Sequence, residues 1–224
     1  YIKHIDITNL RIIQQGSLEP SPNVNLITGD NGAGKTSILE AIYLLGRGKS
    51  FRHAHSGPFI KNGFSHSMVI ADLVNEDDKS SRLGVERARN STRVKSDGMD
   101  VLRRSELLRL LPLQIITPSS HELIEKGPDT RRGFLDYGMF HVEHGYLDQL
   151  SEYTRALKQR NAALRQAQID VARSYNPVLS ELGAGIHQHR TAYLIHLTEK
   201  LEMTLGALNA NFPIKLSISP GWDT

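Results

Sequence analysis

The chain has 224 residues, enough for one sizeable domain or for one and a half. Hydrophobic residues make up 39% of it and charged residues 23%, which is typical of a soluble globular protein and excludes collagen-like, disulfide-scaffold and mainly disordered chains. Cysteine is absent, so a disulfide framework and a thiolate metal site are excluded as well. No apolar run approaches the roughly 18 residues of a membrane span, and the N-terminal segment has no signal-peptide core. We therefore expect a cytoplasmic protein that does not enter a membrane.

The formal net charge is only +3, but the positive charges are concentrated in two stretches. Residues 47–52 contain Arg47, Lys49 and Arg52 and no acidic residue. The charged positions of residues 79–104 are mostly basic. Clustered positive charge steers a polyanion toward a surface, although lysine and arginine also protect exposed strands from pairing. Charge alone leaves both interpretations open.

The N-terminal part of the chain is predicted to form strands around one helix. Residues 2–10 begin with apolar side chains typical of a strand, and residues 24–28 form a compact apolar strand that is followed by glycine. Residues 36–45 carry apolar side chains at helical spacing, and Gly46 and Gly48 end this helix. We therefore expect a strand, a glycine-rich turn and a helix in this order.

Strand signals return after this helix. Residues 68–74, 82–87 and 93–95 are the strand candidates, and turn-rich segments separate them. Asp97-Gly98 is a further turn signal. Antiparallel strands inserted after such a helix predict an α/β fold with a mixed sheet.

The chain becomes mostly helical after about residue 104. A short helix ends at Pro112, and residues 113–117 are a candidate for a buried strand. Pro128 suits the first turn of a helix that runs toward His141. Residues 214–219 then alternate apolar and polar side chains like a strand.

Two long helices are expected between these segments, over 147–164 and 177–208, with Pro177 between them. Both carry leucines at three-four spacing, and long helices joined by a short connection pack antiparallel. The leucines of 147–164 could instead mediate dimerisation, but we favour packing on the following helix of the same chain.

Residues 29–36, Gly-Asp-Asn-Gly-Ala-Gly-Lys-Thr, match the phosphate-loop pattern G-x-x-x-x-G-K-[ST] at every fixed position. Glycine allows positive φ and lets the backbone approach a phosphate, so that successive amides form an anion nest at the positive end of the helix. Lys35 can then bridge the β- and γ-phosphates, and the Thr36 hydroxyl can ligate Mg²⁺. The predicted nucleotide contacts are Gly29, Asp30, Asn31, Gly32, Ala33, Gly34, Lys35 and Thr36.

A P-loop phosphotransferase acting on a small molecule is the alternative function. Such an enzyme needs a metal-binding aspartate at the carboxyl end of a strand that follows the helix. Asp72 has apolar residues on both sides, so we interpret it as an interior strand residue. The chain has no Asn-Lys-x-Asp motif for guanine either.

The phosphate loop and its helix, residues 31–42, resemble the nucleotide loop of ABC-type heads of the SMC class. Four further stretches narrow this to the RecF family of bacterial DNA replication and repair proteins. They are Thr8-Asn9-Leu10-Arg11, Lys49-Ser50-Phe51-Arg52, residues 127–136 and residues 157–164. Together they extend from the start of the chain into its helical part.

This resemblance implies an ABC-type ATPase head lobe and a second, mostly helical lobe. It also implies that two ATP molecules with Mg²⁺ are held between the heads of a homodimer, which closes on gapped DNA next to duplex. Members hydrolyse ATP slowly and, with RecR, help to load RecA in recombination, replication restart and the SOS response. On these grounds Lys35 and Thr36 take the phosphate and Mg²⁺ roles. Arg11 is expected near the nucleotide phosphates, and Gln114 could be the metal- and water-sensing glutamine.

The resemblance also predicts how the chain is divided. Residues 1–111 should form the N-terminal part of the ATPase lobe, 112–211 the helical second lobe, and 212–224 the start of a strand that returns to the first lobe. The signature motif, the Walker B acids and the switch histidine of the family have no counterpart in this sequence. We therefore expect an N-terminal fragment that holds nucleotide, does not hydrolyse it, and contains no catalytic residue.

The two basic stretches provide the candidate DNA contacts. Few aromatic residues are interleaved with them, so contact with duplex phosphates is expected rather than stacking on single-stranded bases. The candidates are Arg47, Lys49, Arg52, Arg87, Arg89, Arg93 and Lys95.

Other polar residues receive a structural interpretation. Arg131 and Arg132 stand beside Asp129 and are expected to be structural rather than DNA-binding. His141 and His144 lie three residues apart on a predicted helix and could share a metal, but no third ligand accompanies them. We interpret both as surface histidines.

Overall fold

The computed structural model describes residues 1–52, 58–75, 77–102, 104–143, 145–210 and 212–219. Its contacts divide the chain into two compact units, Tyr1–Ile115 and Ile116–Thr224. The division expected from the sequence, into 1–111, 112–211 and 212–224, stays a prediction. None of the helices in the described ranges is long and apolar enough to cross a membrane.

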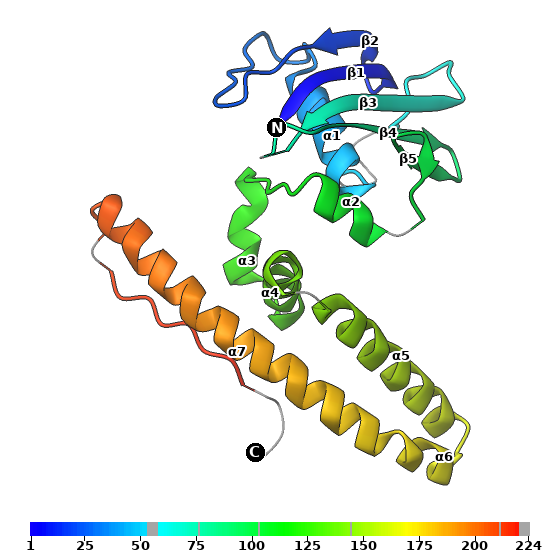
Figure 1. The fold of residues 1–224 in the computed structure, drawn as a ribbon, viewed down its shortest axis with the longest axis vertical. Helices are drawn as coiled ribbons and strands as arrows, with labels where there is room; N and C mark the ends of the chain where they lie inside the picture. Colours follow the sequence, from blue (N-terminus) through cyan, green and yellow to red (C-terminus); the bar gives the residue numbers. More distant parts are fainter. Residues whose placement is uncertain (53–57, 76, 103, 144, 211, 220–224) are drawn as a thin grey trace. The chain divides into compact units, whose positions relative to one another are not determined.

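The first unit is built on a six-stranded sheet in the order β2-β1-β3-β4-β5-β6, in which all neighbouring strands are antiparallel (Figure 1). The strands are β1 (Ile2–Leu10), β2 (Ile13–Leu18), β3 (His66–Val74), β4 (Ser80–Ala88), β5 (Thr92–Ser96) and β6 (Met99–Asp100). Register pairs Ile5 with Ala71 and Ala71 with Leu83, so that alternate apolar side chains share one face. The antiparallel meander predicted after the phosphate-loop helix is present.

One helix covers this apolar face, which we call the inner face. Helix α1 (Lys35–Arg47) buries Ala41, Leu44 and Leu45 completely in a core shared with Ile5 and the other inward side chains of the sheet. Leu107 of α2 (Arg104–Leu110) joins the same core. Burying one such side chain contributes about 1.5–3 kcal/mol, so the core fixes α1 against the sheet.

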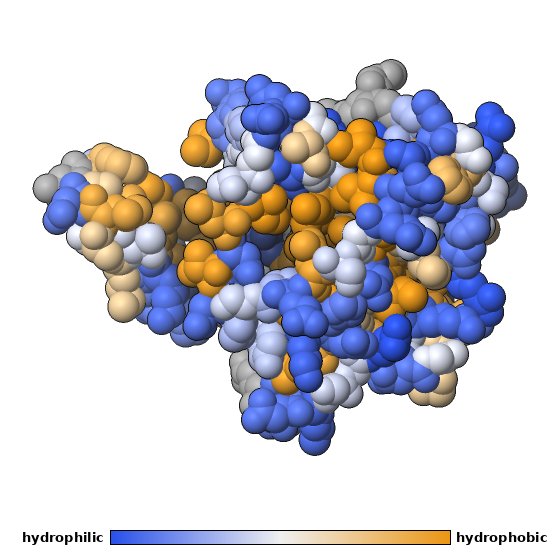
Figure 2. Space-filling model, turned by 90° about the horizontal axis from the view of Figure 1, so that it is seen from above, coloured by the Kyte–Doolittle hydropathy of each residue, from blue (hydrophilic) through white to orange (hydrophobic). Residues whose placement is uncertain are grey.

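Two predicted strands in this part of the chain are not formed. Residues 24–28 and 113–117 belong to no strand, and Val24, Leu26 and Ile116 are 86%, 87% and 88% exposed. A strand requires a neighbour for its backbone N–H and C=O groups, and neither segment has one among the residues described here. The sheet was expected to be mixed, but all the described neighbouring strands are antiparallel. Figure 2 shows apolar side chains at the surface among polar ones in this view.

The second unit is helical. It contains η1 (Pro118–His121), α3 (Glu122–Glu125), α4 (Pro128–Val142), α5 (Tyr146–Arg165), α6 (Ile169–Ser174) and α7 (Asn176–Ala207). Helices α5 and α7 pack against each other as an antiparallel pair (Figure 1), so the leucine-bearing helix packs within its own chain as predicted. The two helices approach closely at Gly185, where an added Cβ would lie 2.2 Å from Nε2 of Gln149. The strand predicted over 214–219 is not formed.

A polar network joins α4, α5 and α7. The Tyr146 hydroxyl donates to Asp136 Oδ1 at 2.5 Å, and Nε and Nη2 of Arg190 donate to the same oxygen at 2.9 and 2.7 Å. Burial, reinforced by the hydrogen bond to Asp136, raises the pKa of Tyr146 above its ordinary value. The network lies beside the apolar cluster of Met139, Tyr146 and Ile186, and it fixes the three helices relative to one another.

Candidate nucleotide-binding site

The phosphate loop adopts the backbone that its glycines predicted. Gly29, Gly32 and Gly34 have φ values of 142°, 87° and 105°, in the region that favours glycine. A Cβ at Gly32 would meet no atom within 4 Å, so glycine is needed there for conformation and not for space. At Gly34 the loop packs on Ile12, in the turn between β1 and β2. A Cβ added at Gly34 would lie 3.4 Å from Ile12 Cδ1.

The amides of this loop point to an anion site. Ala33 donates to the Asp30 carbonyl at 3.2 Å, and Ser37 donates to the Gly34 carbonyl at 2.9 Å. The amides of Gly32, Gly34, Lys35 and Thr36, in contrast, have no acceptor among the described residues. These donors stand at the start of α1, where the helix dipole is positive, and its first turn has no acidic residue. The arrangement is that of a phosphate-binding nest.

Lys35 and Thr36 complete this site. The Lys35 ammonium donates to the carbonyls of Gly29 and Asp30 at 2.7 and 2.8 Å, so it lies across the loop. It has no carboxylate partner in the described ranges. Thr36 is exposed, and its hydroxyl is a hard oxygen ligand of the kind that Mg²⁺ accepts. The two side chains therefore offer one unneutralised cation and one metal ligand beside the free amides.

Arg11, which is expected near the nucleotide phosphates, is paired with a buried carboxylate. Its Nε and Nη2 donate to Oε2 and Oε1 of Glu40 at 2.9 and 2.8 Å, and the two side chains are 7% and 0% exposed. Ser50 Oγ donates to the same carboxylate. Sequence reasoning missed Glu40 and Ser50. One signal was available: Glu40 falls on the buried stripe of α1, three residues after Ser37 and four before Leu44.

Gln114 is not brought to the loop by any contact in the structure. Its side chain is exposed, in a segment without regular secondary structure, and it makes no hydrogen bond with another described residue. Its metal-sensing role stays a prediction.

The candidate DNA contacts in strands β4 and β5 separate into two groups by the face on which they lie. Arg93 pairs in register with Glu86 and forms an ion pair with Asp100 at 3.0 Å, and Lys95 pairs in register with Asp100. Hydrogen bonding from Arg93 lowers the pKa of Asp100. These two cations lie on the outer face of the sheet, opposite the inner face, with acids beside them.

Arg87 lies on the inner face instead, since it alternates with Leu83 and Val85 along β4. Its guanidinium is 4.7 Å from the centre of the Phe59 ring, and that of Arg11 is 5.6 Å from the same centre. Arg87 has no acidic partner in the part of the chain that the structure describes. The structure therefore puts an unneutralised arginine near the β1–β2 turn on which the phosphate loop rests.

The remaining candidates are more dispersed. Arg47 lies at the end of α1, with its guanidinium 5.8 Å from the centre of the Tyr43 ring. Lys49 and Arg89 are exposed, and the Arg52 amide donates to Ser50 Oγ at 2.9 Å. The structure does not gather all seven residues into one patch.

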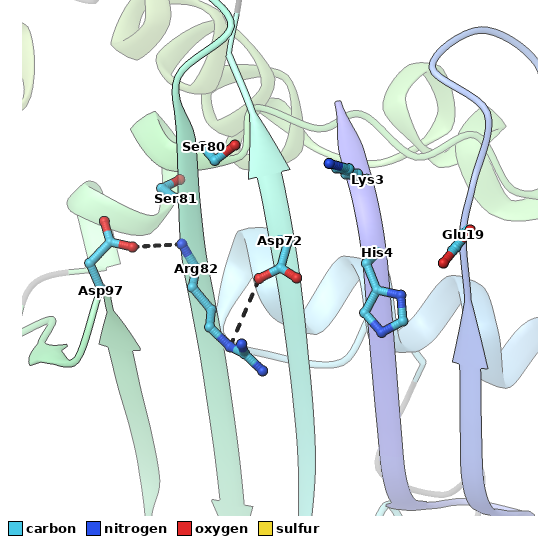
Figure 3. A pocket seen from close by; sticks show the side chains of 8 residues that line it. All are labelled: Lys3, His4, Glu19, Asp72, Ser80, Ser81, Arg82 and Asp97. Carbon is cyan, nitrogen blue, oxygen red and sulfur yellow. Dashed lines mark hydrogen bonds and ion pairs between the residues drawn. The ribbon is translucent and has the colours of Figure 1, made fainter.

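A polar hollow of about 580 Å³ lies at the other end of the sheet (Figure 3). It is lined by Lys3, His4, Glu19, Asp72, Ser80, Ser81, Arg82 and Asp97. Asp72 faces Arg82 across neighbouring strands at 3.9 Å. Because Asp72 pairs with His4 whereas the phosphate loop rests on Ile12, this carboxylate stands at the opposite end of β1 from the loop. It therefore behaves as an interior strand residue, in agreement with its interpretation from the sequence.

Arg131 and Arg132 make contacts with residues near them in the chain. Nη1 of Arg131 donates to the carbonyls of Ile124 and Lys126 at 3.1 and 2.7 Å, and Arg132 pairs with Asp129. The described residues contain no group of three His, Cys, Asp or Glu side chains that could hold a metal ion. His144 lies outside the described residues.

With this geometry in view, a family model described as an AAA domain matches residues 4–170. The chain belongs to the AAA domain family. The DNA replication and repair protein RecF of Stutzerimonas stutzeri is 39% identical over 225 residues, which are 99% of this chain and 61% of that protein. RecF of Aliivibrio fischeri is 36% identical over 224 residues, 99% of this chain and 62% of that protein.

A solved structure of the recombination mediator protein RecF with ATP is similar to this chain with a TM-score of 0.81 and 29% identity, covering 92% of this chain and 57% of that one. The expected resemblance to RecF is thus confirmed, and so is the fold class, an ABC-type ATPase head lobe with a helical second lobe. The chain spans about 61% of the length of the curated relatives that it matches.

Proposed function

We propose that this chain binds ATP with Mg²⁺ at the phosphate loop and belongs to a DNA-binding protein of recombinational repair. The observation that carries the proposal is the set of amides without an acceptor among the described residues, those of Gly32, Gly34, Lys35 and Thr36, at the positive end of α1. The similar protein RecF has been solved with ATP, which supports this choice of nucleotide.

Thr36 is the residue of this chain that would ligate the metal ion. Its exposed hydroxyl can ligate Mg²⁺. Phosphate oxygens and water would supply the other ligands, as is usual for this ion. When bound, Mg²⁺ would neutralise phosphate charge. The loop amides and Lys35 hold and orient the triphosphate.

Hydrolysis is not proposed for this chain. A general base must stand within reach of the attacking water, but the acid nearest in sequence on α1, Glu40, has both oxygens occupied and no exposed surface. Asp72, the acid that a small-molecule phosphotransferase would need, lies at the far end of β1 and pairs with Arg82. The phosphotransferase alternative therefore has no support in this geometry.

DNA is proposed as the polyanion that contacts the basic side chains without acidic partners. Arg87 is the leading candidate because it is unneutralised, whereas Arg93 and Lys95 already face Asp100. For the whole protein, similarity to RecF supports an ATP-dependent homodimer in the cytoplasm. We propose that it binds gapped DNA and, with RecR, promotes RecA loading.

Equilibrium titration with a fluorescent ATP analogue tests the nucleotide site. Wild-type chain should bind in the presence of Mg²⁺, and Lys35→Ala should bind at least tenfold more weakly, because a buried or oriented charge-assisted contact contributes about 1.5–3 kcal/mol. Equal binding by the two proteins would contradict the proposal. Robust Mg²⁺-dependent ATP turnover that disappears in Lys35→Ala would contradict the absence of hydrolysis.

A further inference from the structure

Glu40 is an acidic residue at an apolar position. It lies on the buried face of α1 and has no exposed surface. A buried carboxylate is tolerated only when it is paired and hydrogen-bonded. Arg11 supplies two of its hydrogen bonds, at 2.9 and 2.8 Å, and the Ser50 hydroxyl supplies a third. The carboxylate therefore joins α1 to two segments that are distant in sequence.

Arg11 in turn belongs to the turn that supports the phosphate loop. Its backbone has φ of 54°, an unusual value for a residue other than glycine, and its amide donates to the Phe59 carbonyl at 2.9 Å. The next residue, Ile12, lies under Gly34, and the Ile12 carbonyl accepts a hydrogen bond from Lys61 Nζ at 2.8 Å. The position of Arg11 therefore influences the position of Ile12, the residue that supports the phosphate loop at Gly34.

The Arg11 guanidinium has little capacity left for a nucleotide. Nε and Nη2 are bound to Glu40, Nη1 donates to the Pro58 carbonyl at 3.2 Å, and the side chain is 7% exposed. To reach a phosphate it would have to leave Glu40 buried without its partner. Removing one partner of a buried ion pair is strongly destabilising.

We infer that Arg11 and Glu40 form a positioning pair for the phosphate loop, and that Arg11 is not itself a phosphate ligand. The pair holds the β1–β2 turn against Gly34 and so keeps the free amides aimed at the phosphates. Ser50 extends the pair to the segment after α1, since its hydroxyl donates to Glu40 and accepts from the Arg52 amide. This inference rests on the proposed nucleotide site.

Affinities for ATP and for ADP separate positioning from direct contact. Glu40→Gln and Arg11→Gln should each weaken ATP and ADP by the same factor, about 3- to 10-fold, because the loop amides serve phosphates that both nucleotides carry. The double variant should bind about as weakly as either single one, because residues in one ion pair are not additive. A direct γ-phosphate ligand behaves differently. Selective loss of ATP in Arg11→Gln, or tighter ATP binding when Glu40→Gln releases the arginine, would overturn the inference.

Controls keep the test specific. Asp100→Asn breaks the exposed pair with Arg93 on the outer face and should leave both affinities unchanged. Affinities are measured well below the melting temperature of each variant, and unchanged affinities in folded Glu40→Gln refute the positioning role. Should that variant not fold, Ser50→Ala removes one donor to Glu40 and should show a smaller loss that is equal for ATP and ADP. Wild-type chain that fails to bind ATP refutes the nucleotide site instead, so the two failures are distinguishable.

Discussion

Replacing Gly32 by alanine should weaken ATP binding while leaving the fold intact. Gly32 has φ of 87°, and an added Cβ would meet no atom within 4 Å, so the methyl group itself fits. The penalty is therefore one of backbone conformation. A residue with a Cβ in the left-handed region costs roughly 1–2 kcal/mol relative to glycine.

The structure indicates where this penalty falls. Gly32 is exposed and its amide has no acceptor among the described residues, so the loop can relax in the free protein at little cost in stability. Binding must then restore the strained conformation, and the whole penalty is subtracted from the affinity. About 1–2 kcal/mol corresponds to a rise in Kd of about 5- to 30-fold.

Gly98→Ala is the matched control. Gly98 has φ of 83° in the turn between β5 and β6, and an added Cβ there would also meet no atom within 4 Å. The two variants carry similar strain at different sites, and both are titrated with the fluorescent ATP analogue. Gly98→Ala should bind like wild type. Wild-type affinity in Gly32→Ala, or an equal loss in both variants, would refute the reasoning.

Three further outcomes are expected. Leu44→Ala, at a fully buried site of α1, should lower the free energy of unfolding by about 2–5 kcal/mol in a denaturant titration, and a loss below 1 kcal/mol would contradict the core assignment. Tyr146→Phe leaves the Asp136 and Arg190 pair without its phenol donor and should cost about 1–3 kcal/mol at neutral pH. Because the folded pKa of Tyr146 is raised, this contribution is fully present below the unfolded pKa of about 10 and is lost as pH rises through the folded value. Wild type should therefore lose stability in alkali more steeply than Tyr146→Phe, as thermal melts at several pH values can establish. Finally, Arg87→Gln should reduce the salt dependence of duplex DNA binding by about 0.9 in the log–log slope, whereas Arg93→Gln should change it little; equal slopes for the two variants would rule out the division by face.

The local features of this protein were predictable from neighbouring residues. The conformation of the phosphate loop follows from glycine spacing over residues 29–36, and helix α1 follows from the apolar period of the next ten or so positions. Alternation along β3 and β4 predicted their strands, and their turns predicted the antiparallel pairing. Each of these depends on interactions within a few residues.

Strand pairing between distant segments was predicted less well. Residues 24–28 and 113–117 have the apolar composition of buried strands, yet no described strand lies beside them and their apolar side chains are exposed. Composition indicates that a segment can form a strand. The strand forms only when a second segment lies in register beside it and completes a ladder of hydrogen bonds. The same reason applies to residues 214–219.

The amino-acid order alone thus determined the geometry of the candidate phosphate site, because its amides, its glycines and its lysine are contiguous in the chain and their conformation is set by backbone sterics. Only the tertiary structure paired Arg11 with Glu40, which is 29 residues away. The tertiary structure also distinguished Arg87 from Arg93. Strand register places these two arginines on opposite faces of the sheet, and Arg93 has an acidic partner there whereas Arg87 has none among the described residues. Pairing across such distances is decided by which surfaces the core brings together, and no local pattern encodes it.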